Sequence, residues 1–258
     1  MVQKRKDTDF CVSFAEIFEE MAKNFRKHSS DRLPIVYEDQ LVIVVDKPAG
    51  LLSMSTGGEG ETTAYSILTD YVRSQSGGRI FIVHRLDRET SGLLLFAKDS
   101  RTKEMLQQNW NETVLERKYV ALLEGGIESE EGWIETWLRD NPKSMIVSCM
   151  GTDTRLRPEA LETDGWKFAS SHCRKLQECR IEGVDYTLVE FELETGRKNQ
   201  IRVHAQWIGH PVAGDKKYGA RTNPLRRLAL HARTLSFIHP HTGKTLSFTS
   251  RIPKGFTR

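Results

Sequence analysis

The amino-acid sequence predicts an α+β fold with a mixed, mainly antiparallel central sheet and flanking helices and loops. Strand-like segments outnumber helical ones along the 258 residues, and their spacing is too irregular for a regular series of parallel βαβ units. Hydrophobic residues make up 38% and charged residues 28% of the chain. That balance is typical of a globular protein that is large enough to bury a substantial core.

The first 32 residues are expected to form a helical extension. Apolar residues recur at helical spacing between residues 10 and 28, and acidic residues precede basic ones there. This order suits the helix dipole, which favours acids at the N-terminal end and bases at the C-terminal end. The pattern ends near Ser29–Asp31, and Pro34 marks a boundary. The sequence therefore predicts an extension over 1–32 and one main domain over 33–258.

The main domain is expected to mix short strands with a few helices. Its first half predicts strands at 35–37 and 41–45, a turn at 47–50, a loop of small residues at 53–63, a helix at 64–74, a strand at 79–83, a loop at 84–92, a strand at 93–97, a helix at 102–109 and a strand at 118–123. Residues 124–165 are polar and glycine-rich, and predict short strand-like pieces. The last segments are a strand at 185–193, a helix at 200–208, and strands at 235–238 and 245–248 around a turn at 240–243.

Composition argues against several functional classes. The longest apolar runs are far too short to cross a bilayer, and the chain has no signal-peptide core, so we expect a cytoplasmic protein. The four cysteines form no C-x-x-C pair, which argues against a zinc ribbon or a redox dithiol. The histidines of the C-terminal part match no familiar ligand spacing such as H-E-x-x-H, so no metal is expected.

The net charge of +3 conceals an uneven distribution. Residues 197–258 contain 13 Lys and Arg against one acid, Asp215, whereas the first 196 residues contain 25 Lys and Arg against 34 acids. These counts give +12 for the C-terminal segment and −9 for the rest. Such a split suggests that the C-terminal quarter meets a polyanion. The alternative is that these cations are scattered over the surface and paired with acids from elsewhere in the chain.

A polar loop between two apolar segments is the strongest candidate for a catalytic site. Within residues 81–96, Asp87 lies between Arg85 and Arg88 and close to His84. Rigid strands on both sides of a polar loop commonly fix catalytic groups. Positive neighbours favour the ionised carboxylate that a nucleophile or a base requires. Without further information, a surface loop of salt bridges explains the same pattern.

Two other segments are candidates for binding a ligand. In residues 194–204 a strand ends and a helix begins, and Arg197, Lys198 and Arg202 would face either phosphates or a buried carboxylate. The plainer interpretation is a helix with a solvated basic face. Tyr119 stands at the start of a strand, where it would be a core or rim residue or would stack on a base.

Together these segments resemble the motifs of the RluA-type pseudouridine synthases. The loop at 84–92 matches the pattern H-R-L-D-x-x-T-S-G without a gap, and the strand at 116–121 resembles K-x-Y-x-A. Residues 196–204 and 209–215 resemble G-R-x-H-Q-[IL]-R-V-H and G-H-P-[IV]-x-G-D. The family's opening and closing patterns also have counterparts, so the resemblance runs from about residue 35 to 253.

The resemblance implies an RNA-modifying isomerase. Such an enzyme converts selected uridines of structured RNA, ribosomal or transfer RNA, into pseudouridine. The reaction breaks the bond between ribose and a uracil nitrogen, turns the base and rejoins it through carbon. Because no atom is lost and no redox change occurs, no cofactor and no metal are expected. RNA is the expected partner, membrane association is not expected, and the protein is expected to be a monomer.

The resemblance also assigns roles to individual residues. Asp87 is the central carboxylate, which attacks the sugar or the base or removes a sugar proton, and Arg202 pairs with it and keeps it ionised. Tyr119 stacks on the target base and takes part in the final proton transfer, while Ile201 packs against the other side of the ring. The base must leave its stack, and Arg85 is the candidate to fill the vacated space. The remaining residues expected to bind substrate are His84, Arg88, Thr90, Ser91, Gly92, Arg197 and Gln200.

Two departures from the family pattern and two alternatives accompany this interpretation. Asn199 stands where the family usually has His, and the first 32 residues are too few for the separate RNA-binding domain that many relatives carry. The serious alternative is a catalytically inactive RNA-binding protein of the same fold. A protein kinase is the other alternative, because His84–Asp87 superficially resembles a kinase catalytic loop. It is disfavoured, since the sequence has no glycine-rich phosphate loop and no D-F-G segment.

Overall fold

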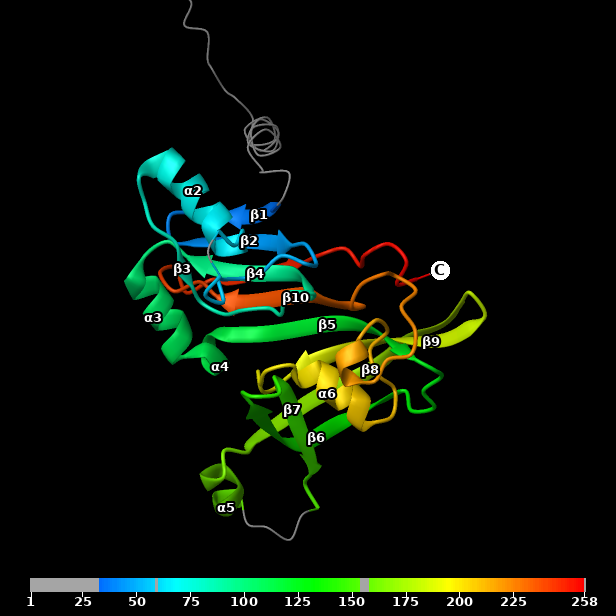
Figure 1. The fold of residues 1–258 in the computed structure, drawn as a ribbon. Helices are drawn as coiled ribbons and strands as arrows, with labels where there is room; N and C mark the ends of the chain where they lie inside the picture. Colours follow the sequence, from blue (N-terminus) through cyan, green and yellow to red (C-terminus); the bar gives the residue numbers. More distant parts are fainter. Residues whose placement is uncertain (1–32, 59, 154–157, 258) are drawn as a thin grey trace, which may run out of the picture.

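A mixed β-sheet of 11 strands runs through the part of the chain that the structure describes (Figure 1). The structure is a computed structural model that describes residues 33–58, 60–153 and 158–257. The helix expected at 10–28, and with it the extension 1–32, lies outside the described residues. Within the described ranges, no helix has the length and apolar character needed to span a membrane.

Most of the described elements are strands. The strands are β1 (Ile35–Glu38), β2 (Val42–Lys47), β3 (Phe81–Ile82), β4 (Ser91–Ala97), β5 (Val114–Glu124), β6 (Glu131–Asn141), β7 (Ile146–Gly151), β8 (Lys167–Ile181), β9 (Val184–Leu193), β10 (Leu230–Ile238) and β11 (Thr245–Thr249). The helices are α2 (Ala64–Ser76), α3 (Ser100–Gln108), α4 (Trp110–Thr113), α5 (Pro158–Thr163), α6 (Gln200–Trp207) and the 3-10 turn η1 (Lys216–Tyr218).

The sheet has the order β1-β2-β4-β10-β5-β9-β8-β6-β7, with β3 added on β4 and β11 on β10. The pairings between these strands are antiparallel, except that β10 runs parallel to β4 over two residue pairs, His231 with Ser91 and Ala232 with Gly92. A Cβ atom at Gly92 would lie 2.1 Å from the Ala232 carbonyl oxygen, so this seam requires glycine. The α+β class and the mixed, mainly antiparallel sheet are confirmed.

Helices bury apolar side chains against both parts of the sheet. Helix α2 places Leu68 and Val72 in a cluster with the inner residues of β2 and β4. Alternate residues of these two strands point the other way and pack with Leu106 of α3 and with β10. Helix α6 buries Ile201 and Ala205 against β5 and β9 on the other side of the β4–β10 seam. Each part of the sheet therefore has its own core, and the seam joins them.

The helix starts follow from local hydrogen bonding. Thr63 and Ser66 form a reciprocal capping box at α2, with backbone-to-hydroxyl distances of 3.0 Å and 2.9 Å. Asp99 caps α3 by accepting the Thr102 backbone N–H at 2.8 Å. Gly77 ends α2 in the left-handed conformation. These short-range signals explain why both helices begin within a few residues of their expected positions.

Residues 124–181 differ from the expectation. Short strand-like pieces were expected over 124–165, but β6 has 11 residues, and the 15-residue strand β8 was not expected at all. Strand β8 is paired on both sides, with β6 and with β9, although many of its side chains are polar and partly exposed. Its backbone pairing comes from distant segments, and so the local sequence does not reveal it. The strand expected at 79–83 is shorter, Phe81–Ile82.

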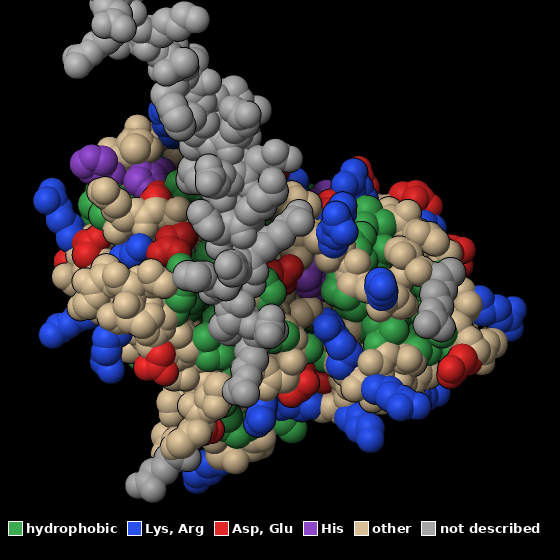
Figure 2. Space-filling model, turned by 90° about the horizontal axis from the view of Figure 1, so that it is seen from above, with side chains coloured by type: hydrophobic (Ala, Val, Ile, Leu, Met, Phe, Trp, Pro, Cys, Tyr) green, Lys and Arg blue, Asp and Glu red, His purple; other side chains and the backbone are tan. Residues whose placement is uncertain are grey.

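On the face shown in Figure 2, Lys and Arg side chains lie among those of Asp and Glu. Three cations of the C-terminal quarter form ion pairs with acids from earlier in the chain: Lys198 with Asp140 at 2.7 Å, Arg202 with Asp87 at 3.1 Å, and Arg233 with Glu190 at 3.6 Å. The charge imbalance is therefore partly neutralised within the fold, as the alternative interpretation proposed.

Candidate active site

The loop between β3 and β4 presents Asp87 beside the β4–β10 seam. On one side of Asp87, the backbone N–H of buried Leu86 donates to Ser53 Oγ at 3.0 Å, and the same hydroxyl donates to the Leu86 carbonyl at 2.8 Å. On the other side, the Thr90 N–H donates to the Asp87 carbonyl at 3.1 Å. Since the backbone is held on both sides, the direction of the Asp87 carboxylate is set before any ligand binds.

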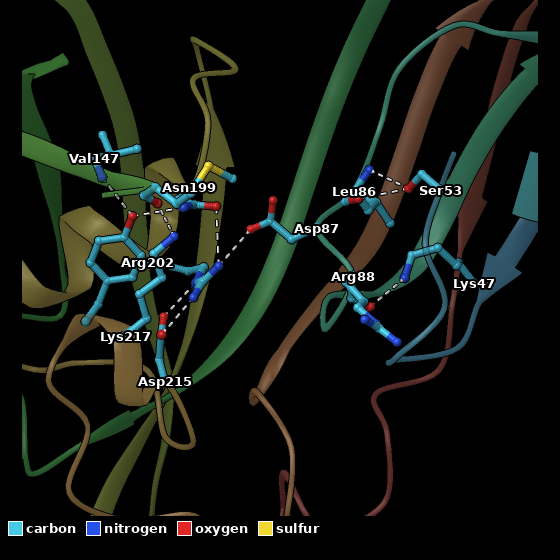
Figure 3. Close-up of polar contacts among 12 residues, drawn as sticks. Lys47, Ser53, Leu86, Asp87, Arg88, Val147, Asn199, Arg202, Asp215 and Lys217 are labelled. Atoms are coloured by element: carbon cyan, nitrogen blue, oxygen red, sulfur yellow. Dashed lines mark hydrogen bonds and ion pairs between the residues drawn. The ribbon is translucent and has the colours of Figure 1, made fainter. Parts of the chain in front are cut away.

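A fully buried lysine supports the same loop (Figure 3). Lys47, the last residue of β2, donates from Nζ to three backbone carbonyls at 2.7–3.1 Å, those of Pro48, Leu51 and Arg88. Burial lowers the pKa of Lys47 to about 8, and the charges of Glu89 and Asp87 oppose this shift only in part. Lys47 thus ties the residue after Asp87 to the turn that follows β2.

Arg202 of α6 holds Asp87 from the opposite side of the cleft. Its Nη1 lies 3.1 Å from Asp87 Oδ2, and its Nε and Nη2 donate to the two oxygens of Asp215 at 2.6 Å and 2.8 Å. The Asp215 side chain is 1% exposed and that of Asp87 is 29% exposed. Burial alone would lower the pKa of Arg202, but hydrogen bonds and charges from Asp215 and then Asp87 raise it. The guanidinium therefore stays charged and stays in place.

The geometry leaves half of the Asp87 carboxylate available. Figure 3 shows Oδ2 directed to Arg202, while no described residue hydrogen-bonds Oδ1. A carboxylate held through one oxygen and free at the other can attack an electrophile or accept a proton.

Asn199 and Tyr218 complete the support of Arg202. Asn199 precedes α6 in the left-handed conformation, with φ 55°, which Asn tolerates better than most residues. Its Nδ2 donates to the Tyr218 hydroxyl at 2.8 Å, and its Oδ1 accepts from Arg202 Nη1 at 3.3 Å. The Val147 N–H donates to the same hydroxyl at 3.2 Å, and the guanidinium lies 4.9 Å from the centre of the Tyr218 ring. The residue that departs from the family pattern thus contacts Arg202 directly and is linked to Asp87 through it.

Tyr119 of β5 and Ile201 of α6 line the same cleft as Asp87. Burial raises the pKa of Tyr119 to about 12; the Asp87 charge adds to this shift and the Arg117 charge opposes it. The phenol is therefore protonated at neutral pH. Ile201 is buried, so the cleft combines an aromatic ring and aliphatic side chains with the Asp87 carboxylate. Such a mixture suits a flat, polar heterocycle.

Gln200 shapes the wall of the cleft through the protein's own hydrogen bonds. Its Oε1 accepts from the Thr195 hydroxyl at 2.8 Å and from the Arg197 N–H at 2.9 Å. Its Nε2 donates to the Ser170 carbonyl at 2.9 Å and to the Ser171 hydroxyl at 2.8 Å. All hydrogen-bonding positions of this amide are used, so Gln200 fixes the turn between β9 and α6.

The structure brings most of the expected site residues to one cleft. From the expected set, the cleft is lined by Arg85, Asp87, Thr90, Tyr119, Arg197, Gln200, Ile201 and Arg202. Leu86, Leu193, Asn199 and Leu230 complete the lining. Residues 87 and 202, which are far apart in the sequence, thus meet as the resemblance implies.

Four expected residues lie outside this lining. His84 accepts the Leu95 N–H through Nε2 at 3.0 Å, and burial lowers its pKa to about 3. Arg88 is 65% exposed on the surface. Ser91 is buried, where its hydroxyl contacts His231 Nδ1 at 2.9 Å and accepts from Arg227 at 2.7 Å. Gly92 lies in the β4–β10 seam. In this arrangement these four residues shape the Asp87 loop.

Sequence reasoning did not identify Lys47, Asp215 or Tyr218 as parts of the site. The signal for Asp215 was present, because it ends the quoted G-H-P-[IV]-x-G-D pattern, and so was that for Lys47, which begins the K-P-A-G turn. Nothing local marked Tyr218. The described residues contain no group of three or more His, Cys, Asp or Glu positioned to hold a metal ion.

Comparisons with known proteins place this geometry in a family. The family model described as RNA pseudouridylate synthase matches residues 41–207, which is more than half of the chain. The chain belongs to the RNA pseudouridylate synthase family. The matched segment includes Asp87, Tyr119 and Arg202, and the members of the family are isomerases.

Relatives and solved structures agree with this assignment. The chain is 39% identical over 227 residues to the uncharacterized RNA pseudouridine synthase YlyB of Bacillus subtilis, covering 86% of this chain and 70% of that protein. It is 35% identical to the ribosomal large subunit pseudouridine synthase D of Nitrosomonas europaea, covering 90% of this chain and 66% of that protein. The structure of human RNA pseudouridylate synthase domain containing 1 matches with a TM-score of 0.67 and 25% identity, covering 86% of this chain and 84% of that one.

Proposed function

We propose that this protein isomerises uridines in RNA to pseudouridine, with Asp87 as the acting carboxylate. The proposal rests on one observation: Asp87 offers one oxygen to the cleft while Arg202 holds the other at 3.1 Å. The resemblance of the chain to pseudouridine synthases over most of its length supports the same reaction.

The reaction requires an ionised carboxylate and no external reagent. The bond from C1′ to N1 breaks, a bond from C1′ to C5 forms, C5 loses a proton and N1 gains one. Asp87 attacks the sugar, attacks the base, or removes a sugar proton, and each route begins from the charged form. The guanidinium of Arg202 favours that form, because an opposite charge within hydrogen-bond distance stabilises the carboxylate.

Tyr119 and Ile201 are proposed to hold the target base between them. Stacking on the Tyr119 ring would orient the uracil, and Ile201 would exclude water from its other side. Because the pKa of Tyr119 is raised to about 12, a role in the final proton transfer requires the phenol to release its own hydrogen as it accepts another.

The target uridine is proposed to leave its stack before it reaches Asp87, since a base inside a helix does not expose its sugar carbon to a carboxylate. Arg85, which is exposed at the mouth of the cleft, is proposed to occupy the vacated space. Arg197 at the opposite wall would contact the RNA backbone.

Structured RNA is the proposed substrate, and ribosomal RNA is favoured over transfer RNA because two relatives are named ribosomal large subunit pseudouridine synthases. The deciding experiment maps pseudouridines in RNA from cells with and without the gene. Purified wild-type protein should then convert the mapped uridine in a transcript, whereas Asp87→Ala should not.

The alternative of an inactive RNA-binding protein has a distinct outcome. In that case both wild type and Asp87→Ala would bind RNA with equal affinity, and neither would form pseudouridine in any cellular RNA. Conversion by the wild type alone would reject it.

A further inference from the structure

A second hollow adjoins the cleft at Asp87, and the proposed function does not use it. It has a volume of about 430 Å³ and shares Arg85, Tyr119, Leu193 and Arg197 with the cleft. Its outer wall is formed by Trp110 and Asn111 of α4, by Arg117 of β5, and by the turn after β9. Figure 1 shows how these segments lie, with α4 leading into β5 close to the end of β9.

The hollow is rich in guanidinium groups that form no ion pair with a carboxylate of the described residues. Arg117 donates from Nη2 to the carbonyls of Leu193 at 3.0 Å and Glu194 at 3.2 Å, and Arg197 donates from Nε to the Phe168 carbonyl at 2.9 Å. Among the described residues, no ion pair within 4.0 Å includes Arg85, Arg117 or Arg197. The Glu194 carboxylate is exposed at the rim. Arg117 and Arg197, which are held in place by carbonyls, and the exposed Arg85 are suited to a phosphate backbone.

Aromatic side chains form another part of the wall. The His84 and Trp110 rings lie 5.0 Å apart and are tilted by 42°, and Arg117 lies 5.8 Å from the centre of the Trp110 ring. Because His84 Nε2 accepts the Leu95 N–H, the neutral imidazole carries its proton on Nδ1, for which the described residues supply no acceptor. The hollow thus offers π surfaces, a neutral N–H donor and fixed positive charges together.

We propose that this hollow is a second nucleotide subsite, which takes the unpaired nucleotide adjacent in the RNA chain to the target uridine. Aromatic surfaces beside cations bind single-stranded bases, and a base inside a duplex does not expose its face to them. The two hollows share four residues, so a chain that places a uridine at Asp87 passes directly into the second hollow. The inference rests on the proposed function and adds that the substrate is unpaired for at least two consecutive nucleotides.

The test uses an eight-nucleotide oligouridylate as the probe and the full-length protein. Binding should quench the fluorescence of Trp110. Trp110→Phe should lose this quenching and keep its affinity within about twofold, because the ring remains. Trp110→Ala should bind about 5- to 150-fold more weakly, the loss expected for one stacked base. The control is Trp133→Ala, which removes a tryptophan that is exposed in a different hollow and should leave affinity unchanged.

Arg117→Gln tests for a phosphate contact, because a purely structural role of Arg117 would leave the salt dependence of binding unchanged. Loss of one phosphate contact to a single strand should reduce the slope of log affinity against log salt by about 0.7. The proposal is overturned if Trp110→Ala binds as the wild type does, if Trp133→Ala weakens binding equally, or if fluorescence quenching is the same in wild type and Trp110→Phe.

The outcome is separable from that of the proposed function. Pseudouridine formation in the mapped transcript is measured independently of oligouridylate binding. If binding responds to Trp110 while no uridine is converted, the subsite stands and the isomerase proposal fails. If conversion proceeds and the Trp110 variants bind normally, the subsite fails and the isomerase proposal stands.

Discussion

Two buried cations lie on opposite sides of Asp87, and they are stabilised in different ways (Figure 3). Arg202 contacts two carboxylates, those of Asp87 and Asp215, and its pKa is raised. Lys47 contacts three backbone carbonyls and, within the described ranges, no carboxylate at hydrogen-bond distance, and burial lowers its pKa to about 8. A full opposite charge overcomes the desolvation of a cation, whereas carbonyl dipoles do so only in part.

The difference matches what each cation does. Arg202 must remain charged, because it forms the ion pair that holds the Asp87 carboxylate. Lys47 acts through the positions of its hydrogens, which join the turn after β2 to the carbonyl of Arg88. Arg202 thus has an electrostatic role and Lys47 a structural one. Mutations around Asp87 should therefore affect enzyme activity and the free energy of unfolding to different extents.

The largest effect is expected for Asp87→Asn, which removes the charge between the two cations. Activity should fall by at least about 10³-fold, because an amide neither attacks nor accepts a proton as a carboxylate does. The free energy of unfolding should change by at most about 1 kcal/mol, since Asp87 is partly exposed and Arg202 retains Asp215. Turnover assays and urea titrations measure both quantities, and a variant with even a tenth of wild-type activity would remove Asp87 from its role.

Compared with Asp87→Asn, Asp215→Asn should lower the free energy of unfolding more and activity less. It leaves the buried Arg202 with the partly exposed Asp87 as its remaining carboxylate, and breaking a buried ion pair costs about 3–5 kcal/mol. Activity should fall by about 10²-fold, because the guanidinium is no longer held in position. Asp140→Asn is the matched control: its pair with Lys198 is exposed and should contribute less than about 1 kcal/mol. Equal losses in the two variants would contradict the proposed clamp.

Lys47 should make stability depend on alkaline pH. A lysine with a pKa of about 8 in the folded state and 10.5 in the unfolded state binds fewer protons when folded over that interval. The free energy of unfolding should therefore rise with pH between about 8 and 10.5, relative to Lys47→Met, by about 3 kcal/mol in total. Urea titrations of both proteins at several pH values measure the difference. Parallel curves across this window would show that Lys47 is not desolvated.

The smallest effect is expected at Asn199. Asn199→Ala removes the bonds to Tyr218 and Arg202 and should cost about 2 kcal/mol with a several-fold loss of activity. Asn199→His, which introduces the residue usual in the family, should keep more activity, because a neutral imidazole also offers one donor and one acceptor. Thermal unfolding and turnover assays compare the two variants; equal activity would mean that the contact with Arg202 is unimportant.

Much of the fold follows from local patterns. Strand β4 and helices α2 and α3 lie close to their expected positions, because apolar periodicity and capping depend on neighbouring residues. Strand β8 was missed for the opposite reason, since it is stabilised by β6 and β9 rather than by its own composition.

The candidate site divides in the same way. Asp87, Tyr119 and Arg202 belong to local motifs, so the sequence alone pointed to an RNA pseudouridine synthase and to the residues proposed to act in it. Only the tertiary structure brought Asp215 and Tyr218 to Arg202, packed Gly92 against Ala232, and joined Trp110 to the turn after β9. The physical reason is range: a motif records which groups the chemistry needs, whereas the burial and pairing of those groups arise from segments that meet only when the sheet closes at its seam.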